Sequence, residues 1–130
     1  MNSILTSIKK MLGIEDTYEH FDIDIIIHIN SALTVLNQIG IGPEQGYCIT
    51  SKAETWDDYL TDLQYVEAVK TYVYLKVRLV FDPPQNSFLV DAMERQIREY
   101  EWRLNVIAEG GNNIENWRKN KSYFGWIRFA

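Results

Sequence analysis

The stretch "LQYVEAVKTYVYLKVRLVFDPP", Leu63–Pro84, decides the fold because its apolar residues would cover most of the circumference of a helix. Valines recur along one face at helical spacing, at Val66, Val69, Val73, Val77 and Val80. A second apolar face carries Ala68, Tyr72, Leu75 and Leu79. Such a helix lies at the centre of a core or between subunits. Proline lacks the amide donor that a helix needs, so Pro83 ends it and we predict a central helix over Leu63–Phe81.

Helical periodicity also precedes this central segment. A short helix is predicted over Ser3–Leu12, ended by Gly13. A longer helix is predicted over Asp22–Gln38, with Asp22 as its N-cap. Its apolar stripe consists of Ile25, Ile29, Leu33 and Leu36. Within the irregular segment that follows, "ETWDDYL" predicts one helical turn that directs Trp56 and Leu60 inward.

A last helix is predicted from a cap at Asn86 or Ser87 to about Ala108. Its apolar stripe consists of Leu89, Met93, Ile97, Tyr100, Leu104 and Ile107. Opposite charges four residues apart predict a face exposed to water, at Glu94–Arg98, Arg95–Glu99 and Glu99–Arg103. The sequence therefore predicts an all-α fold, a small bundle of about four helices with an extended C-terminal arm.

Charge divides the chain into two parts. Residues 1–110 contain 9 Lys and Arg against 17 Asp and Glu, a net charge of −8. Residues 111–130 contain 4 basic residues against 1 acidic residue, a net charge of +3, and the whole chain carries −5. We expect a helical domain over 1–110 and a C-terminal docking arm over 111–130. The acidic domain argues against wrapping nucleic acid, because phosphate binding needs a positive surface.

Motifs for catalysis or cofactor binding are not evident. The single cysteine, Cys48, excludes an intrachain disulfide, and His20 and His28 do not have metal-ligand spacing. "GIGPEQG" lacks the Lys-Ser/Thr of a phosphate-binding loop. No apolar run approaches the ~20 residues of a membrane span. We expect no enzymatic activity, no cofactor, no metal and no membrane association.

The arm ends in "NWRKNKSYFGWIRFA", Asn116–Ala130, which combines aromatic and basic residues. Nucleic-acid binding, membrane-surface binding, packing onto its own domain and docking on another protein are all compatible with this composition. Docking is favoured, because Trp, Tyr and Arg dominate binding hot spots. The candidate apolar anchors are Trp117, Tyr123, Phe124, Trp126 and Phe129. The candidate partners for acidic groups are Arg118, Lys119, Lys121 and Arg128.

Three stretches in order resemble the head–tail connector (adaptor, or head-completion) proteins of tailed bacteriophages. They are "FDIDIIIHINSALTVLNQIGIGPEQGYCI", "EAVKTYVYLKVRLVFDPPQNS" and "MERQIREYEWRLN". The DPP turn and the "EWRLN" ending are the more specific elements, and the similarity spans about Ile4 to Ala108. The arm lies outside it, so no role of the arm can be transferred residue by residue.

The resemblance implies a virion structural protein made in the bacterial host cytoplasm and located in the neck at the capsid vertex. Such subunits form a ring, usually of twelve copies, beneath the portal protein. The ring extends the channel for double-stranded DNA, which passes without sequence-specific binding, and offers a platform for a downstream neck or tail protein. An acidic channel wall would repel DNA phosphates, and the candidate channel-facing acids are Glu15, Asp16, Glu19, Asp22 and Asp24. The alternative is a nucleic-acid-binding accessory protein that uses the arm.

Overall fold

A computed structural model describes residues 3–109, with the side chain of Leu63 excepted. In chain order the helices are α1 (Ile4–Met11), α2 (Asp22–Gln38), α3 (Trp56–Tyr59), the 3-10 helix η1 (Leu63–Tyr65), α4 (Val66–Phe81) and α5 (Ser87–Ala108). Within 3–109 the only β-pairing is an isolated bridge between Ser3 and Thr55. The predicted all-α fold is therefore confirmed.

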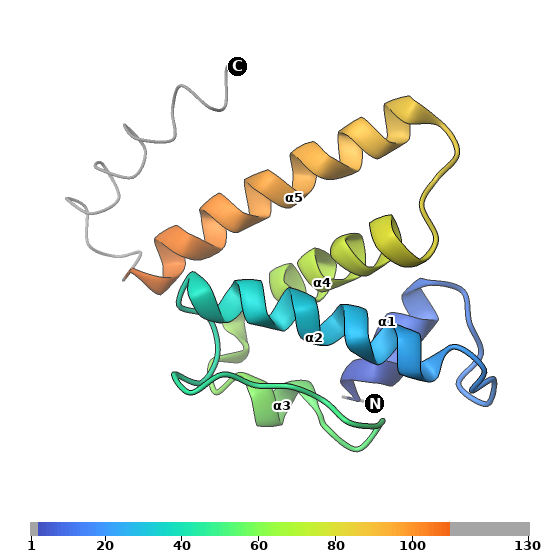
Figure 1. The fold of residues 1–130 in the computed structure, drawn as a ribbon. Coiled ribbons are helices and arrows are strands. Elements are labelled where there is room, and N and C mark those ends of the chain that lie inside the picture. The colour runs from blue at the N-terminus through green and yellow to red at the C-terminus, as the bar shows by residue number, and fades with distance from the viewer. Residues whose placement is uncertain (1–2, 110–130) are drawn as a thin grey trace.

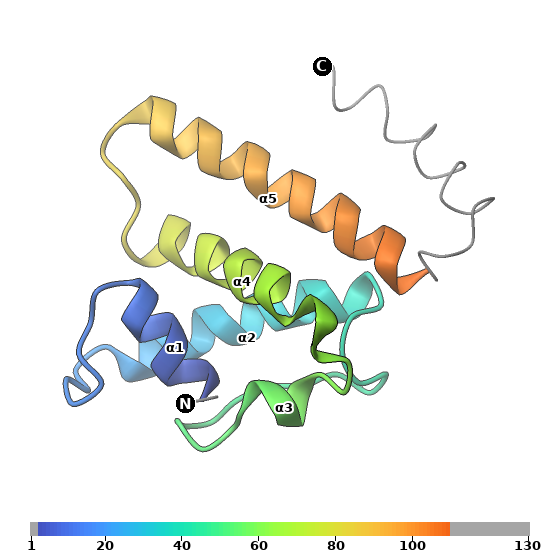
Figure 2. The same ribbon diagram turned by 180° about the vertical axis from the view of Figure 1, so that it is seen from behind.

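Helix α4 occupies the centre of the bundle, as its sequence predicts. It packs against α2 on one side and α5 on the other, and α1 contacts both α2 and α4 (Figures 1 and 2). Its buried residues are Val69, Tyr72, Val73, Leu75 and Val77. The predicted start at Leu63 is wrong by one turn: the first residues form η1, in which the Gln64 amide donates to the Asp62 carboxylate at 3.0 Å.

Helix α2 has the predicted bounds and buries the whole predicted stripe. The predicted N-cap is wrong, because Phe21 occupies that position and the Asp22 carboxylate pairs with Lys9 instead. After α2 the chain turns at Gly40, where φ is +96° and an added Cβ would lie 3.0 Å from the Ala108 Cβ. The C-terminal ends of α2 and α5 therefore approach closely.

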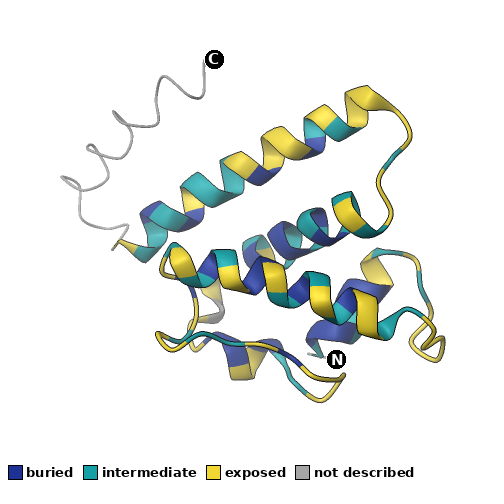
Figure 3. Cartoon of the chain, viewed as in Figure 1, coloured by how far each residue is buried: buried dark blue, intermediate teal, exposed yellow. Residues whose placement is uncertain are grey.

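Helix α5 is packed along only part of its length. Asn86 caps it as predicted, with its Oδ1 accepting from the Phe88 amide at 2.8 Å. The residues buried are Met93, Ile97, Leu104 and Val106. Figure 3 shows the first turns of α5 mostly exposed, and Leu89, predicted to lie in the apolar stripe, is one of the exposed residues. Among the three predicted charge pairs, Glu99–Arg103 forms an ion pair at 2.9 Å.

The segment between α2 and α4 closes the lower end of the bundle. Trp56 and Leu60 are buried as predicted, and the Trp56 indole N–H donates to the Ser7 hydroxyl at 2.8 Å. A capping box between Thr55 and Asp58 starts α3. The short helix therefore fixes the Trp56 side chain against α1.

Candidate functional site

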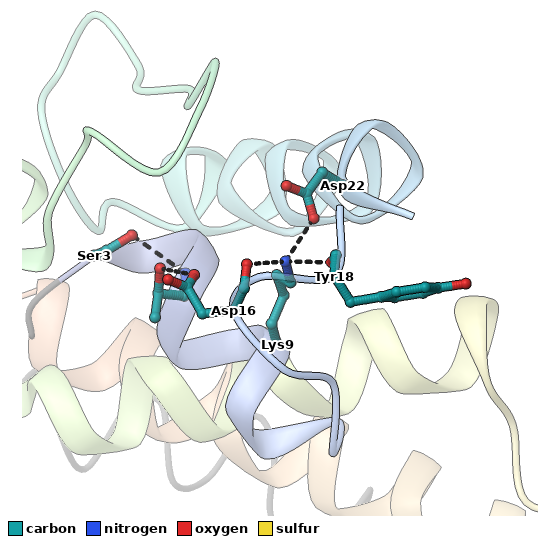
Figure 4. A network of polar contacts seen from close by, with 6 residues as sticks. Ser3, Lys9, Asp16, Tyr18 and Asp22 are labelled. Atoms are coloured by element: carbon teal, nitrogen blue, oxygen red, sulfur yellow. Dashed lines mark hydrogen bonds and ion pairs between the residues drawn. The ribbon is translucent and has the colours of Figure 1, made fainter. Parts of the chain in front are cut away.

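The acidic turn between α1 and α2 is built around a buried lysine. Lys9 is 1% exposed, and its Nζ donates to the carbonyls of Asp16 at 3.1 Å and Tyr18 at 2.7 Å. The same Nζ lies 2.8 Å from the Asp22 carboxylate (Figure 4). The ammonium group thus makes two hydrogen bonds to carbonyls and one ion pair. Lys9 therefore fixes the course of the turn and the start of α2.

The five candidate channel acids fall into two groups in this region. Glu15, Asp16, Glu19 and Asp24 are exposed, whereas the Asp22 side chain is only 23% exposed and is paired with Lys9. Asp16 also accepts from the Thr6 hydroxyl at 2.9 Å, which ties the turn to α1. The Lys9 network thus holds a cluster of exposed carboxylates in one place. Their orientation toward a DNA channel stays a prediction.

Large apolar side chains are exposed at one end of the bundle. They are Met11, Tyr18, Ile23, Ile27, Val80, Phe88 and Leu89. We call this set the apolar end. It comes from the C-terminal ends of α1 and α4, the N-terminal parts of α2 and α5 and the acidic turn, which lie at the right of Figure 1 and the left of Figure 2. Where exposed apolar side chains form a contiguous patch, they mark a protein–protein or membrane interaction site.

Sequence periodicity placed two residues of the apolar end in the stripes of core-facing residues. Val80 and Leu89 continue the core stripes of α4 and α5 in sequence, yet both side chains are exposed, at the end of α4 and the start of α5. Phe88, which is 82% exposed, was not predicted as a site residue. The sequence did offer a signal for its exposure. Phe88 lies two residues after the N-cap Asn86 and precedes Leu89, the first residue of the apolar stripe.

A pocket of about 390 Å³ lies near the other end of the bundle. We call it the α2–α3 pocket. It is lined by Gly40, Ile41, Gly42, Pro43, Asp58, Tyr59, Leu60, Thr61, Asp62, Tyr65, Val69 and Ile107. Its lining is largely apolar, but it includes two carboxylates that are exposed to solvent, those of Asp58 and Asp62.

Tyr59 is the most buried polar group in this lining. The residue is 3% exposed, and its hydroxyl has no hydrogen-bond partner within residues 3–109. Burial raises the pKa of the Tyr59 hydroxyl far above its ordinary value, so the group is neutral and can accept or donate a hydrogen bond. A buried hydroxyl without a partner is uncommon and indicates a place where a further polar group fits.

Asn30 on α2 and Glu54, which precedes α3, fix the loop between these two helices. Asn30 on α2 bonds both backbone groups of Ile49: its Nδ2 donates to the carbonyl at 3.0 Å and its Oδ1 accepts from the amide at 2.7 Å. The Glu54 carboxylate accepts from the Thr50 amide and hydroxyl and from the Ser51 amide. Partial desolvation opposes ionisation of Glu54, but these hydrogen bonds together hold its pKa below the ordinary value.

Other candidate features were a metal site, a membrane span and the docking residues of the arm. Within residues 3–109 no three His, Cys, Asp or Glu side chains gather as metal ligands, and no helix of that part is long and apolar enough to cross a membrane. Burial and a 2.7 Å hydrogen bond to Glu101 raise the pKa of the Tyr72 hydroxyl, which links α4 to α5. The nine predicted docking residues of the arm, Trp117 to Phe129, lie outside the described residues.

Comparison with known proteins gives one match. No curated protein and no solved structure matches the chain significantly. The model of the family described as phage connector protein matches residues 4–111, which covers all helices from α1 to α5 and leaves residues 112–130 outside. This range contains the central helix, the DPP turn and the "EWRLN" ending, on which the resemblance in sequence rests. The chain therefore belongs to the phage connector protein family.

Proposed function

We propose that this chain is a virion structural protein that forms a ring beneath the portal protein, extends the DNA channel and offers a platform for a downstream neck or tail protein. Membership of the phage connector family supports a location in the neck of the virion. We place twelve copies in the ring and expect double-stranded DNA to pass without sequence-specific binding. No membrane contact and no catalytic step are needed for this role.

The apolar end is the observation that carries the proposal. A cyclic assembly of more than two copies needs a heterologous interface, in which two different surfaces of each subunit meet. The apolar end lies on one side of the bundle only, so it supplies one of those two surfaces. Fully burying an exposed phenylalanine such as Phe88 contributes about 2 kcal/mol. Several such side chains together supply a stable contact.

The interface can be tested with a single charge within the apolar end. Phe88→Asp adds a carboxylate that would have to be desolvated at the interface, so we expect ring formation with the portal protein to be lost while the far-ultraviolet circular dichroism spectrum is retained. Gln96→Asp makes the same charge change at an exposed position farther along α5 and should leave the ring intact. Native mass spectrometry of each variant mixed with portal protein measures this. Equal ring formation by both variants would show that the apolar end is not an interface of the ring.

The acidic turn suits the wall of the channel under this proposal. Negative charge repels phosphates and lets DNA slide, and Lys9 keeps these carboxylates in place. Lysine substitutions at Glu15, Glu19 and Asp24, which are exposed and make no contact with Lys9, should slow or trap DNA during passage. Full infectivity of a phage carrying all three reversals would count against a channel location.

The arm is proposed to dock on the portal or on an adjacent subunit in the assembled neck. The helices described within residues 3–109 all precede the arm, so deletion of Gly111–Ala130 should leave a folded helical domain. We expect the truncated protein to lose incorporation into portal-bearing heads. Incorporation at the level of the full chain would remove the docking role of the arm.

The charge of the arm also favours one alternative, a nucleic-acid-binding accessory protein. Its aromatic residues could stack on bases and its cations could contact phosphates. This alternative predicts affinity that falls steeply as salt rises. A gel-shift assay with single- and double-stranded DNA at low salt separates the two functions, because the connector role predicts no stable complex.

A further inference from the structure

We infer that the α2–α3 pocket binds this chain's own C-terminal arm before assembly, and that the indole of Trp117 is the group inserted into the pocket. The pocket and the arm are separate features, one in the described residues and one beyond them. The arm is close to the pocket along the chain, and its side chains complement the pocket in polarity and charge. The inference concerns the isolated subunit and does not depend on the ring.

Connectivity puts the arm within reach of the pocket. Ile107 in the last turn of α5 lines the pocket, and Gly110, the last residue before the arm, follows three residues later. Trp117 follows after seven more residues, which span at most about 25 Å of extended chain. Gly110 and Gly111 give the chain the freedom to reverse direction there. A connection this short raises the local concentration of the arm at the pocket to roughly the millimolar range.

Polarity is complementary as well. The pocket wall is largely apolar and its volume of about 390 Å³ accommodates an indole. The Tyr59 hydroxyl is buried and lacks a partner in the described residues, and it lies in the wall against Gly42, where an added Cβ would be 3.2 Å from it. An indole N–H is a donor with no acceptor role, so it satisfies this hydroxyl. Trp117 is also the first aromatic residue after Gly110, so it is the first that can reach the pocket.

Charge orients the same segment. Asp58 and Asp62 are exposed carboxylates of the pocket lining, and Arg118 and Lys119 directly follow Trp117. Insertion of the indole therefore brings two cations beside two carboxylates. Such exposed pairs contribute little energy individually, but they favour this segment over an uncharged one. They also predict that the contact weakens as salt shortens the range of electrostatic attraction.

The experiment uses the full chain with p-benzoylphenylalanine in place of Asn116, the residue before Trp117, so that the indole is kept. After irradiation, mass spectrometry should find crosslinks to residues 40–43 and 58–65, and their yield should fall several-fold in 1 M salt. An equal mixture of ¹⁵N-labelled and unlabelled protein tells whether the joined segments come from one copy. We expect crosslinks within one copy. Crosslinks between copies would mean that the arm reaches a neighbour, and absence of crosslinks to the pocket would mean that another partner or nothing fills it; either result overturns the inference.

A matched pair of variants tests the role of the exposed carboxylates of the pocket lining. Asp62→Lys reverses a carboxylate at the pocket, and we expect at least a fivefold loss of the crosslink. Glu94→Lys makes the same charge change at an exposed position on α5 outside the pocket lining and should leave the yield unchanged. Asp62 also accepts from the Gln64 amide, so circular dichroism checks that the fold of each variant persists. Equal yields from two folded variants would contradict an electrostatic contact with these carboxylates.

Discussion

Replacement of Lys9 by methionine tests whether one buried ammonium group holds the acidic turn. The substitution keeps the length of the apolar stem but removes three N–H donors. The carboxylate of Asp22 then loses its cation, and the carbonyls of Asp16 and Tyr18 lose the donor that binds them. Breaking a buried ion pair by removing one partner costs about 3–5 kcal/mol. Because Asp22 keeps 23% exposure, we expect the lower end, about 3 kcal/mol of unfolding free energy.

Urea denaturation followed by circular dichroism measures this loss. Domains of this size are stable by only about 5–15 kcal/mol, so the midpoint should move well outside experimental error. Lys10→Met is the control, because it removes the same charge from the next residue of α1, whose side chain is exposed. In a double-mutant cycle, Lys9→Met combined with Asp22→Asn should cost less than the sum of the single changes. A loss within about 0.5 kcal/mol of the Lys10→Met value would refute the assigned role.

Three further substitutions test the pocket and the loop between α2 and α3. Asn30→Leu leaves the amide and carbonyl of Ile49 without their partners and should cost about 2 kcal/mol in urea denaturation; an unchanged midpoint would contradict this. Gly42→Ala places a Cβ 2.5 Å from the Tyr59 ring at a φ of +89°, so we expect destabilisation of about 2–4 kcal/mol, whereas Gly13→Ala, at φ +82° with open space, should cost less. Glu54→Gln removes a carboxylate whose folded-state pKa lies below its ordinary value. Its contribution is present above the ordinary pKa and is lost as pH falls through the lowered one, so the stability gap to the parent protein at pH 7 should close in acid; a gap independent of pH would contradict it.

Periodic apolar residues predicted the elements and the central position of α4 because a helix surrounded by neighbours must be apolar on several faces. The same reasoning failed at the ends of α4 and α5. Val80 and Leu89 continue their stripes, but the packing against neighbouring helices ends before them, and their side chains are exposed. Periodicity describes which face of a helix is apolar and carries no information on how far along that face a neighbour extends.

Polar contacts were the least predictable features. Asp22 at the start of α2 matches the pattern of an N-cap, yet the buried Lys9 from another helix takes its carboxylate. Asn30 lies within the turns of α2 and bonds a loop nineteen residues further along. These choices depend on tertiary distance, which local sequence does not encode. The α2–α3 pocket was missed for the same reason, because its walls come from four separate segments.

Electron microscopy of portal-bearing heads incubated with the purified full chain shows whether the chain forms the proposed ring. We expect added ring density beneath the portal, with twelve subunits around a continuous channel, and loss of that density with Phe88→Asp but not with Gln96→Asp. Heads that gain no density at the vertex with the parent protein, or protein that instead coats free DNA, would contradict it.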